Sequence, residues 1–437
     1  MLRWILGGRE AQGAVEKSPT LFIGEEQPKN PFTELQVLKG HFDIVRFLVQ
    51  IDDSRFASAG DDGLVLVWNV ETGERLMELR GHSQQITAMV AWSLINADTS
   101  HTSIITASSD RSLSLWDPDT GNRVQTISDL QSSVKCLLVL EHLDLWLSGG
   151  NELCVWNQDF KLLDIFLLFL FVAVIYKLAV SSKLEVSVQP FRQLTDHHDS
   201  IRVLINVNDG LFASGSHVGE LIIWDAVNWT IQAYEHILWE EPHCDGQAEI
   251  RFVSQKQSDM SIHHLASNGE VVILAAVGSG LYVYNIHSRN VVAYRKMAHD
   301  SNVLHTMLLS DGQLMSCSED GSVRMWEMEP LPLPAEPASP GFFGLWSFGR
   351  SSKQTCPPVK KVPEVPILKS LELTGDLIGH SGAIQMFLSF GEKGLVTCST
   401  DHLVILWKDG ERQSRLRSLA VFQKLEENQG LNSRMST

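Results

Sequence analysis

The chain has 437 residues and a formal net charge of -17, with 35 basic against 52 acidic side chains. A surface this acidic repels phosphate backbones, so general nucleic-acid binding is excluded from the expected functions. The hydrophobic content of 44% is that of a globular protein with a sizeable core. The six cysteines form no CxxC pair, which argues against a zinc site or a disulfide framework and fits a reducing, cytoplasmic compartment.

Residues 1–32 are expected to form a flexible N-terminal segment. Positions 1–9 contain too few apolar residues for a signal peptide, and Leu2 replaces the Gly of a myristoylation motif. Membrane contact is therefore expected to be indirect, through a partner, unless the apolar run at 162–180 supplies it.

A repeated unit begins at residue 40 and dominates the rest of the chain. A Gly-His, Ala-His or Asp-His pair is followed by a Trp, and in four units the interval from His to Trp is identical. The pairs are His41 with Trp68, His197 with Trp224, His299 with Trp326 and His380 with Trp407, whereas His82 and Trp116 lie farther apart. An Asp lies six residues before the Trp in four units, at Asp62, Asp110, Asp320 and Asp401. The alternation of residues between Asp and Trp predicts a β-strand.

This unit resembles the WD40 repeat, in which about 40–45 residues form one four-stranded blade of a β-propeller. The resemblance implies an all-β fold, a propeller over residues 33–413, with Trp156 and Tyr284 in the Trp position of two degenerate units. The stretch from Trp156 to Trp224 is too long for one repeat and too short for two. We therefore expect eight blades with a compressed fourth one, or seven if 157–195 does not form a blade.

In the WD40 family a His, a Ser or Thr, an Asp and a Trp form a hydrogen-bonded network inside each blade. The resemblance implies two complete sets, at His299, Ser318, Asp320 and Trp326, and at His380, Ser399, Asp401 and Trp407. Further sets contain His41, Trp68, His82, Asp110, Trp116, His197 and Trp224. A His-Ser-Asp group also suggests a hydrolase, but a single active site does not need the group several times. We expect structural networks and no catalytic residue, cofactor or metal.

The run 162–180 departs from the repeat because it is almost wholly apolar. Only positions 165–176 are free of charge, a stretch shorter than the ~20 residues that a membrane-spanning helix needs. Repeat units also lie on both sides of the run, so a spanning helix would place half a ring on each side of the bilayer. Buried strands are the favoured interpretation, and a variant chain whose usual blade sequence is replaced is the alternative.

A Pro-rich insertion, 330–366, lies in the loop between the third and fourth strands of one blade. Within it are four aromatic residues and a basic flank: Phe342, Phe343, Trp346, Phe348 and Arg350. Aromatic side chains this dense need something to bury against. The pattern predicts a linear motif that binds a partner, and folding back onto the propeller is the alternative.

The last segment, 414–428, is predicted to be an amphipathic helix, started by Ser414 and stopped by Gly430. Its apolar residues recur every three positions, at Leu416, Leu419, Phe422 and Leu425. The last blade therefore lacks its outer strand, and residues 33–38, which include Leu35 and Val37, are expected to supply it and close the ring. The helix either packs on the rim or docks a partner beside this seam.

Segments such as 44–50, 216–225, 298–305 and 422–428 resemble one group of WD40 proteins, and the resemblance extends over the chain except for about 158–190. It implies a non-catalytic subunit of a complex with two DENN-domain proteins, a GTPase-activating assembly that regulates small GTPases, autophagy and lysosomes. It implies contact with a DENN protein through 33–38 and 414–427. It also implies that 339–354 binds a lysosomal PQ-loop cationic amino-acid transporter, which would recruit a cytoplasmic protein to the lysosomal membrane surface.

The alternative function is that of a substrate receptor for a cullin ubiquitin ligase. Such receptors typically carry Trp-Asp-x-Arg after the third strand of a blade. Here the corresponding positions 116–119 and 224–227 read Trp-Asp-Pro-Asp and Trp-Asp-Ala-Val, so the Arg is missing.

Overall fold

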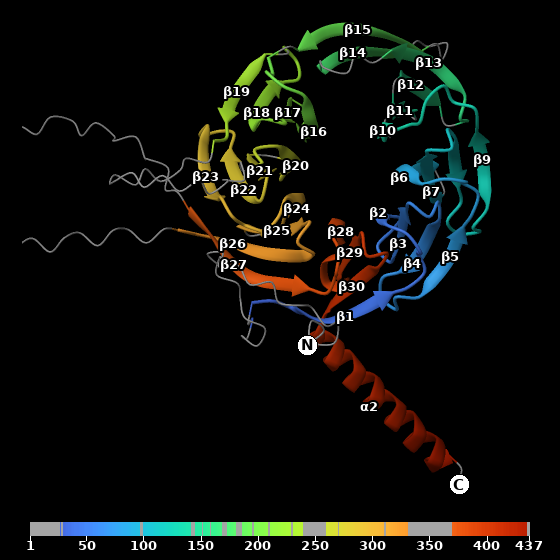
Figure 1. Ribbon diagram of the computed structural model, residues 1–437. Coiled ribbons are helices and arrows are strands. Elements are labelled where there is room, and N and C mark those ends of the chain that lie inside the picture. Colours follow the sequence, from blue (N-terminus) through green and yellow to red (C-terminus); the bar gives the residue numbers. More distant parts are fainter. Residues whose placement is uncertain are drawn as a thin grey trace, which may run out of the picture.

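In the computed structural model, the chain forms a ring of β-sheets around a central channel, and one long helix projects from the ring (Figure 1). The structure describes residues 27–434, except for 239–258, 331–368 and shorter stretches at 28, 97–98, 141–144, 151, 158, 168–172, 181–185, 195, 209, 229, 270 and 310–311. No helix within these described ranges is both long and apolar enough to cross a membrane.

The first three blades each contain four antiparallel strands, ordered from the channel to the rim. Blade one consists of β2 (Val45–Gln50), β3 (Arg55–Gly60), β4 (Val65–Asn69) and β5 (Arg75–Leu79). Blade two consists of β6 (Ile86–Asn96), β7 (Thr99–Ser108), β8 (Leu113–Trp116) and β9 (Arg123–Ile127). Blade three consists of β10 (Cys136–Leu140), β11 (Leu145–Gly149), β12 (Glu152–Asn157) and β13 (Leu162–Leu167).

Blades five to eight complete the ring. Blade five consists of β16 (Ile201–Asn208), β17 (Leu211–Ser216), β18 (Glu220–Asp225) and β19 (Ile231–His236). Blade six consists of β20 (Ile262–Ser267), β21 (Val272–Val277), β22 (Gly280–Asn285) and β23 (Asn290–Arg295). Blade seven consists of β24 (Val303–Leu308), β25 (Gln313–Ser318), β26 (Ser322–Pro330) and β27 (Lys369–Ile378). Blade eight consists of β28 (Ile384–Ser389), β29 (Leu395–Ser399), β30 (Val404–Asp409) and β1 (Phe32–Leu38).

The fourth position of the ring holds only two described strands, β14 (Ala173–Val180) and β15 (Val186–Leu194), which pair with each other. The prediction of eight blades with a compressed fourth one is therefore confirmed. The apolar run 162–180 lies in β13 and β14, and so in strands where it is described. The physical reason for the compression is length, because the stretch between Leu167 and Ile201 is shorter than the about 40–45 residues of a full repeat.

The ring is closed at blade eight by β1, the strand expected at 33–38. β1 pairs antiparallel with β30, and Leu35 lies opposite Trp407. The outermost strand of this blade thus comes from the N-terminal end of the chain, while the three inner strands come from the C-terminal end. Pairing the two ends in one sheet covers the edge of β30 and links the end of the ring to its beginning.

The C-terminal helix, α2, runs from Gly410 to Arg434, so the predicted bounds of 414–428 are wrong. It follows β30 directly because the Asp409 side chain, rather than Ser414, accepts a hydrogen bond from the Arg412 amide (3.0 Å) and caps the first turn. Gly430 lies inside the helix and does not stop it. The insertion 330–366 begins where β26 ends, and its residues 331–366 lie outside the described residues.

The helix is also less amphipathic than predicted. A spacing of three residues falls short of a helical turn of 3.6 residues, so each step rotates the side chain by about 60°. From Leu416 to Leu425 the apolar positions therefore turn through roughly half the circumference instead of forming one stripe. Figure 1 shows α2 leaving the ring with little of its length against it.

Candidate interaction site

Blade seven contains a hydrogen-bonded network that crosses three of its strands. His299 Nδ1 lies 3.0 Å from Asp320 Oδ2, and His299 Nε2 lies 2.8 Å from Ser316 Oγ. The indole Nε1 of Trp326 donates to the same Ser316 oxygen at 2.8 Å. The serine hydroxyl therefore donates to the imidazole and accepts from the indole, which satisfies all three buried polar groups.

The same arrangement recurs in four further blades. The hydroxyl between imidazole and indole belongs to Ser58, Thr106, Ser214 and Thr397 in blades one, two, five and eight, at distances of 2.6–3.0 Å. The imidazole Nδ1 contacts a carboxylate in each: His41 with Asp62, His82 with Asp110, His197 with Glu220 and His380 with Asp401.

Two residues predicted to belong to the networks, Ser318 and Ser399, lie outside them. Ser318 and Ser399 do not contact the histidines, because Ser316 and Thr397, two residues earlier on the same strands, face them instead. The predicted hydroxyls cap the turn that follows: Ser318 accepts from the Asp320 amide, and Ser399 accepts from the Asp401 amide. Side chains alternate along a strand, so two residues that are two positions apart lie on the same face of the sheet but at different points along the strand.

The sequence contains a signal that identifies the correct hydroxyl. In each of the five complete units a Ser or Thr lies ten residues before the Trp, as at Ser316 and Thr397. Glu220 was also missed, because it lies four residues before Trp224 rather than six. It takes the place of the aspartate by accepting hydrogen bonds from His197, His198 and Tyr234.

The electrostatics of three of these networks favour a neutral histidine. Burial lowers the pKa of His82, His197 and His299, and this outweighs the neighbouring carboxylates, which act to raise it. Burial acts to raise the pKa of Asp320, but hydrogen bonds from His299 and Ser322 hold that pKa well below its usual value. A neutral imidazole donating from Nδ1 and accepting at Nε2 matches this combination.

The order carboxylate, imidazole, hydroxyl is that of a hydrolase triad, so the surroundings decide its role. Ser316 is 0% exposed and His299 is 1% exposed, and the serine oxygen is occupied by the indole of Trp326. A substrate carbonyl cannot reach that oxygen. The geometry therefore fits a structural connection between strands and not a nucleophile.

Substituting Ser316 and Ser318 of β25 separately tests this assignment. Ser316→Ala leaves the buried nitrogens of His299 and Trp326 without partners, which is expected to lower the free energy of unfolding by about 2–4 kcal/mol. Ser318→Ala removes the cap of a turn and the hydrogen bond that the Ser318 hydroxyl donates to the Ser301 carbonyl, with a smaller expected loss of about 1–1.5 kcal/mol. Urea denaturation followed by circular dichroism measures both losses. Equal losses for the two variants would contradict the assignment.

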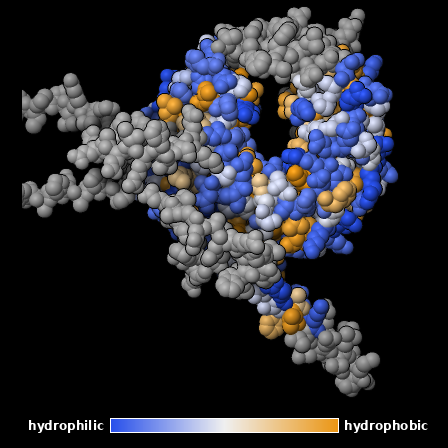
Figure 2. All heavy atoms as spheres, in the orientation of Figure 1, coloured by the Kyte–Doolittle hydropathy of each residue, from blue (hydrophilic) through white to orange (hydrophobic). Residues whose placement is uncertain are grey.

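The second feature of interest is the closure seam, which we define as β1 and α2. Leu35 and Val37 lie on the outer strand of blade eight, and each is 39% exposed. On the helix the exposed apolar residues are Leu416, Leu419, Val421 and Phe422, of which Val421 was not predicted. Figure 2 shows polar side chains where α2 leaves the ring and apolar side chains farther along its described part. Leu425 lies in α2, but its side chain is outside the described residues.

The two parts of the seam are held together by charge. Arg417 of α2 forms a two-pronged hydrogen bond with Glu34 of β1, one branch measuring 3.1 Å. A cavity of about 510 Å³ lies where α2 begins, lined by Phe32, Glu392, Arg412 and Arg415 among others. The seam thus presents apolar, basic and acidic groups on one exposed surface. The predicted loop residues Phe342, Phe343, Trp346, Phe348 and Arg350 lie outside the described residues.

A ring of four-stranded blades, most of them locked by the His, carboxylate, hydroxyl and Trp network, defines a WD40 β-propeller. The sequence profile of the WDR41 β-propeller family matches residues 1–169 and 172–417. The chain therefore belongs to the WDR41 β-propeller family.

Its relatives agree with this membership. WD repeat-containing protein 41 of Homo sapiens is 55% identical over 454 residues, which cover 98% of this chain and 98% of the relative. The protein of the same name from Mus musculus is 52% identical over the same share of both chains. WD repeat-containing protein 1 of Xenopus tropicalis is 31% identical over 40% of this chain and 25% of its own length.

Solved structures support the fold alone. The computationally designed Ika8 protein covers 85% of this chain and 98% of its own, with a TM-score of 0.56 and 16% identity. The WD40 β-propeller domain of Doa1 covers 86% of this chain and 96% of its own, with a TM-score of 0.50 and 16% identity.

Proposed function

We propose that this chain is a non-catalytic scaffold subunit that assembles with two DENN-domain proteins into a complex regulating small GTPases. The observation that supports the proposal is the exposed apolar surface at the closure seam of this WDR41-family propeller. Four apolar side chains of α2 and two of β1 are exposed there, although most large apolar side chains of the described residues lie between blades. Exposed apolar side chains that cluster on one element are typical of a protein-binding surface.

The seam has the features that an interface needs. Phe422, which is 64% exposed, is the largest apolar side chain on the helix, and aromatic residues contribute most to binding energy at interfaces. Arg412 and Arg415 form ion pairs with Glu392 and Glu411, at 3.2 and 3.1 Å, so charged groups of both signs lie beside the apolar side chains and can orient a partner. The outer edge of β1 carries no further strand among the described residues, so a partner can also reach its backbone groups.

The same proposal includes a role in autophagy and recruitment to the lysosomal membrane surface from the cytoplasm. In that arrangement residues 339–354 bind a PQ-loop cationic amino-acid transporter, and the contact with the membrane is indirect. The sequence supports this step through the four aromatic residues and basic flank of 342–350. A propeller suits both tasks because its rigid ring holds separate binding surfaces at fixed positions.

Paired charge substitutions on the helix test the proposal. Leu419→Asp combined with Phe422→Asp places two carboxylates on the seam, and we expect at least a hundredfold weaker binding to the DENN proteins in affinity purification with mass spectrometry. Both side chains are exposed, so the melting temperature should stay within about 2 °C of the parent. Val124→Asp, on the exposed face of β9, is the matched control. Recovery of cullin ligase adaptors instead of DENN proteins would contradict the proposal and support the ligase receptor.

A further inference from the structure

The fourth position of the ring holds no inner strand among the described residues, and we call the place of the two inner strands the gap. Among the described strands β14 and β15 pair only with each other, whereas every other position holds four strands. Figure 1 shows this pair at the outer rim, with β14 on the inner side of β15. The inner edge of β14 therefore presents backbone donors and acceptors toward the channel with no described strand beside it.

One wall of the gap is the inner strand of blade five. Val203 and Val207 of β16 pack against the apolar cluster shared with blade six. Because side chains alternate along a strand, Arg202, Leu204 and Asn206 point the other way, toward the fourth position. All three are exposed, and Leu204 is 57% exposed.

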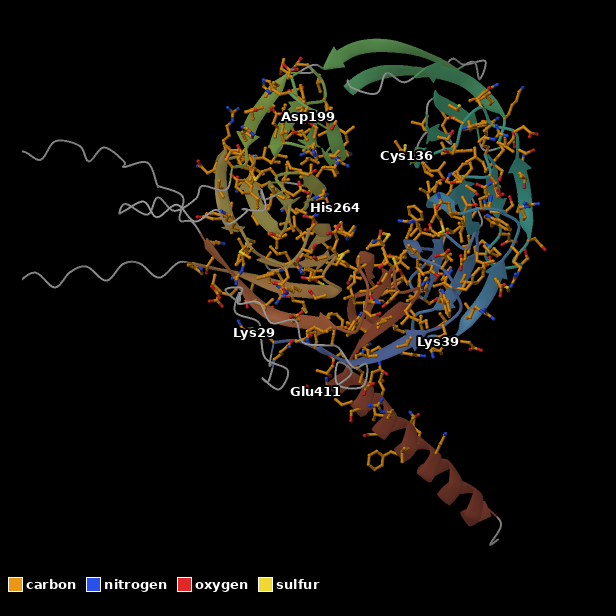
Figure 3. The ribbon with its side chains drawn as sticks, viewed as in Figure 1. Lys29, Lys39, Cys136, Asp199, His264 and Glu411 are labelled. Atoms are coloured by element: carbon orange, nitrogen blue, oxygen red, sulfur yellow. The ribbon has the colours of Figure 1, made fainter. Side chains whose placement is uncertain are left out.

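The opposite wall is the inner strand of blade three. Leu137 and Val139 of β10 pack against the cluster shared with blade two. Cys136 and Leu138 alternate with them and face the fourth position, where both are exposed. In Figure 3 the labelled Cys136 and Asp199, which precedes β16, lie on opposite sides of the opening beneath β14 and β15.

Where the neighbouring blades are complete, both faces of an inner strand are covered. In β24, Met307 packs toward blade eight, and Leu308 packs toward blade six. Among the large apolar side chains of the described inner strands, only Leu138 and Leu204 are classed as exposed, and they flank the two-stranded position from either side. Their exposure is explained by the fourth position, which holds no inner strand among the described residues.

We propose that this gap is a docking site for an extended β-hairpin supplied by a partner protein. The two strands of the hairpin would take the places of the two inner strands, about 4.8 Å apart. The hairpin would then form one sheet layer between blades three and five, at the usual stacking distance of about 10 Å from each. Hydrogen bonding to the edge of β14 requires an extended backbone, which a helix cannot provide. The hairpin carries apolar residues that contact Leu138 and Leu204. It also carries an acidic residue opposite Arg202, which is the charged residue among the five wall residues named above.

A synthetic peptide of residues 45–60 provides the probe, because this β2–β3 hairpin is the inner pair of a complete blade. We expect the fluorescently labelled peptide to bind the full chain one to one in anisotropy titrations and to slow amide exchange in residues 173–180. Leu204→Asp and Leu138→Asp should each weaken binding at least tenfold. Both side chains are more than half exposed, so the variants keep the fold. Val227→Asp, an exposed position elsewhere in blade five, should leave binding unchanged.

Three results would overturn this inference. Unaltered amide exchange in 173–180 would place the peptide elsewhere. Binding that is insensitive to both aspartate substitutions would exclude the two walls. Self-association of the chain in sedimentation, abolished by Leu204→Asp, would assign the gap to a second copy of this chain instead.

Discussion

Replacing Trp326 with Ala is expected to lower the free energy of unfolding by about 3–5 kcal/mol, the range for a buried aromatic side chain replaced by Ala. Trp326 is 1% exposed, and its ring belongs to the apolar cluster between blades six and seven. The guanidinium of Arg295 lies 5.1 Å from the ring centroid. The substitution therefore removes packing, a cation–π contact and the hydrogen bond to Ser316 together. Urea denaturation monitored by circular dichroism gives the loss.

Trp326→Phe separates these contributions. The phenyl ring retains much of the apolar contact but has no N–H to donate to Ser316, so a smaller loss of about 1–3 kcal/mol is expected. A loss below about 1 kcal/mol for Trp326→Ala would mean that the blade tolerates a cavity at this position, and the structural role of the network would be wrong.

Acidification is expected to destabilise the propeller between about pH 6.5 and 4. Burial lowers the pKa of His264 to about 4, and burial together with His264 lowers the pKa of His305 further below its usual value. The two rings lie 4.2 Å apart on the inner strands of blades six and seven. In this range the unfolded chain binds protons that the folded chain does not, so stability falls as the pH falls. His264 alone accounts for about 3 kcal/mol by pH 4.

The lowered pKa values of His82, His197 and His299 act in the same direction, and one carboxyl acts against them. The pKa of Asp376 is raised to about 6, mainly by burial, and its Oδ1 has no hydrogen-bond partner among the described residues. Between pH 6 and 3.8 the folded chain therefore binds a proton at Asp376 that the unfolded chain does not, which adds stability as the pH falls. The loss of stability from the histidines is larger than the gain from Asp376, because several histidines have a lowered pKa and only this one carboxyl opposes them.

Two variants separate these groups in urea denaturation from about pH 7.5 to 4.5. His264→Asn should flatten the acid loss because the titrating imidazole is gone. Asp376→Asn should make the loss steeper, because the carboxyl that takes up a proton between pH 6 and 3.8 is gone. A denaturation midpoint independent of pH over this range would show that these buried groups do not remain neutral in the folded chain.

Much of the ring could be predicted from the spacing of a few residues. The constant interval between His and Trp, as from His299 to Trp326, fixed the blade repeat, because each unit must place both residues at the same point of a four-stranded sheet. The run at 33–38, without a repeat unit before it, had the alternation of a strand and the position to complete blade eight. Register within a strand was harder, because Ser316 and Ser318 share a face and differ only in how far along it they lie.

The amino-acid sequence by itself determined the repeat and the closure by β1, because these depend on spacings and alternation within each unit, whereas the structure decided between eight and seven ring positions. Only the tertiary structure decided which hydroxyl reaches His299, that Glu220 replaces an aspartate, and that Asp409 starts α2 four residues earlier than expected. It also decided that Leu138 and Leu204 face a gap, because the exposure of an inner strand depends on the neighbouring blade. Contacts between distant strands have no counterpart in local sequence spacing.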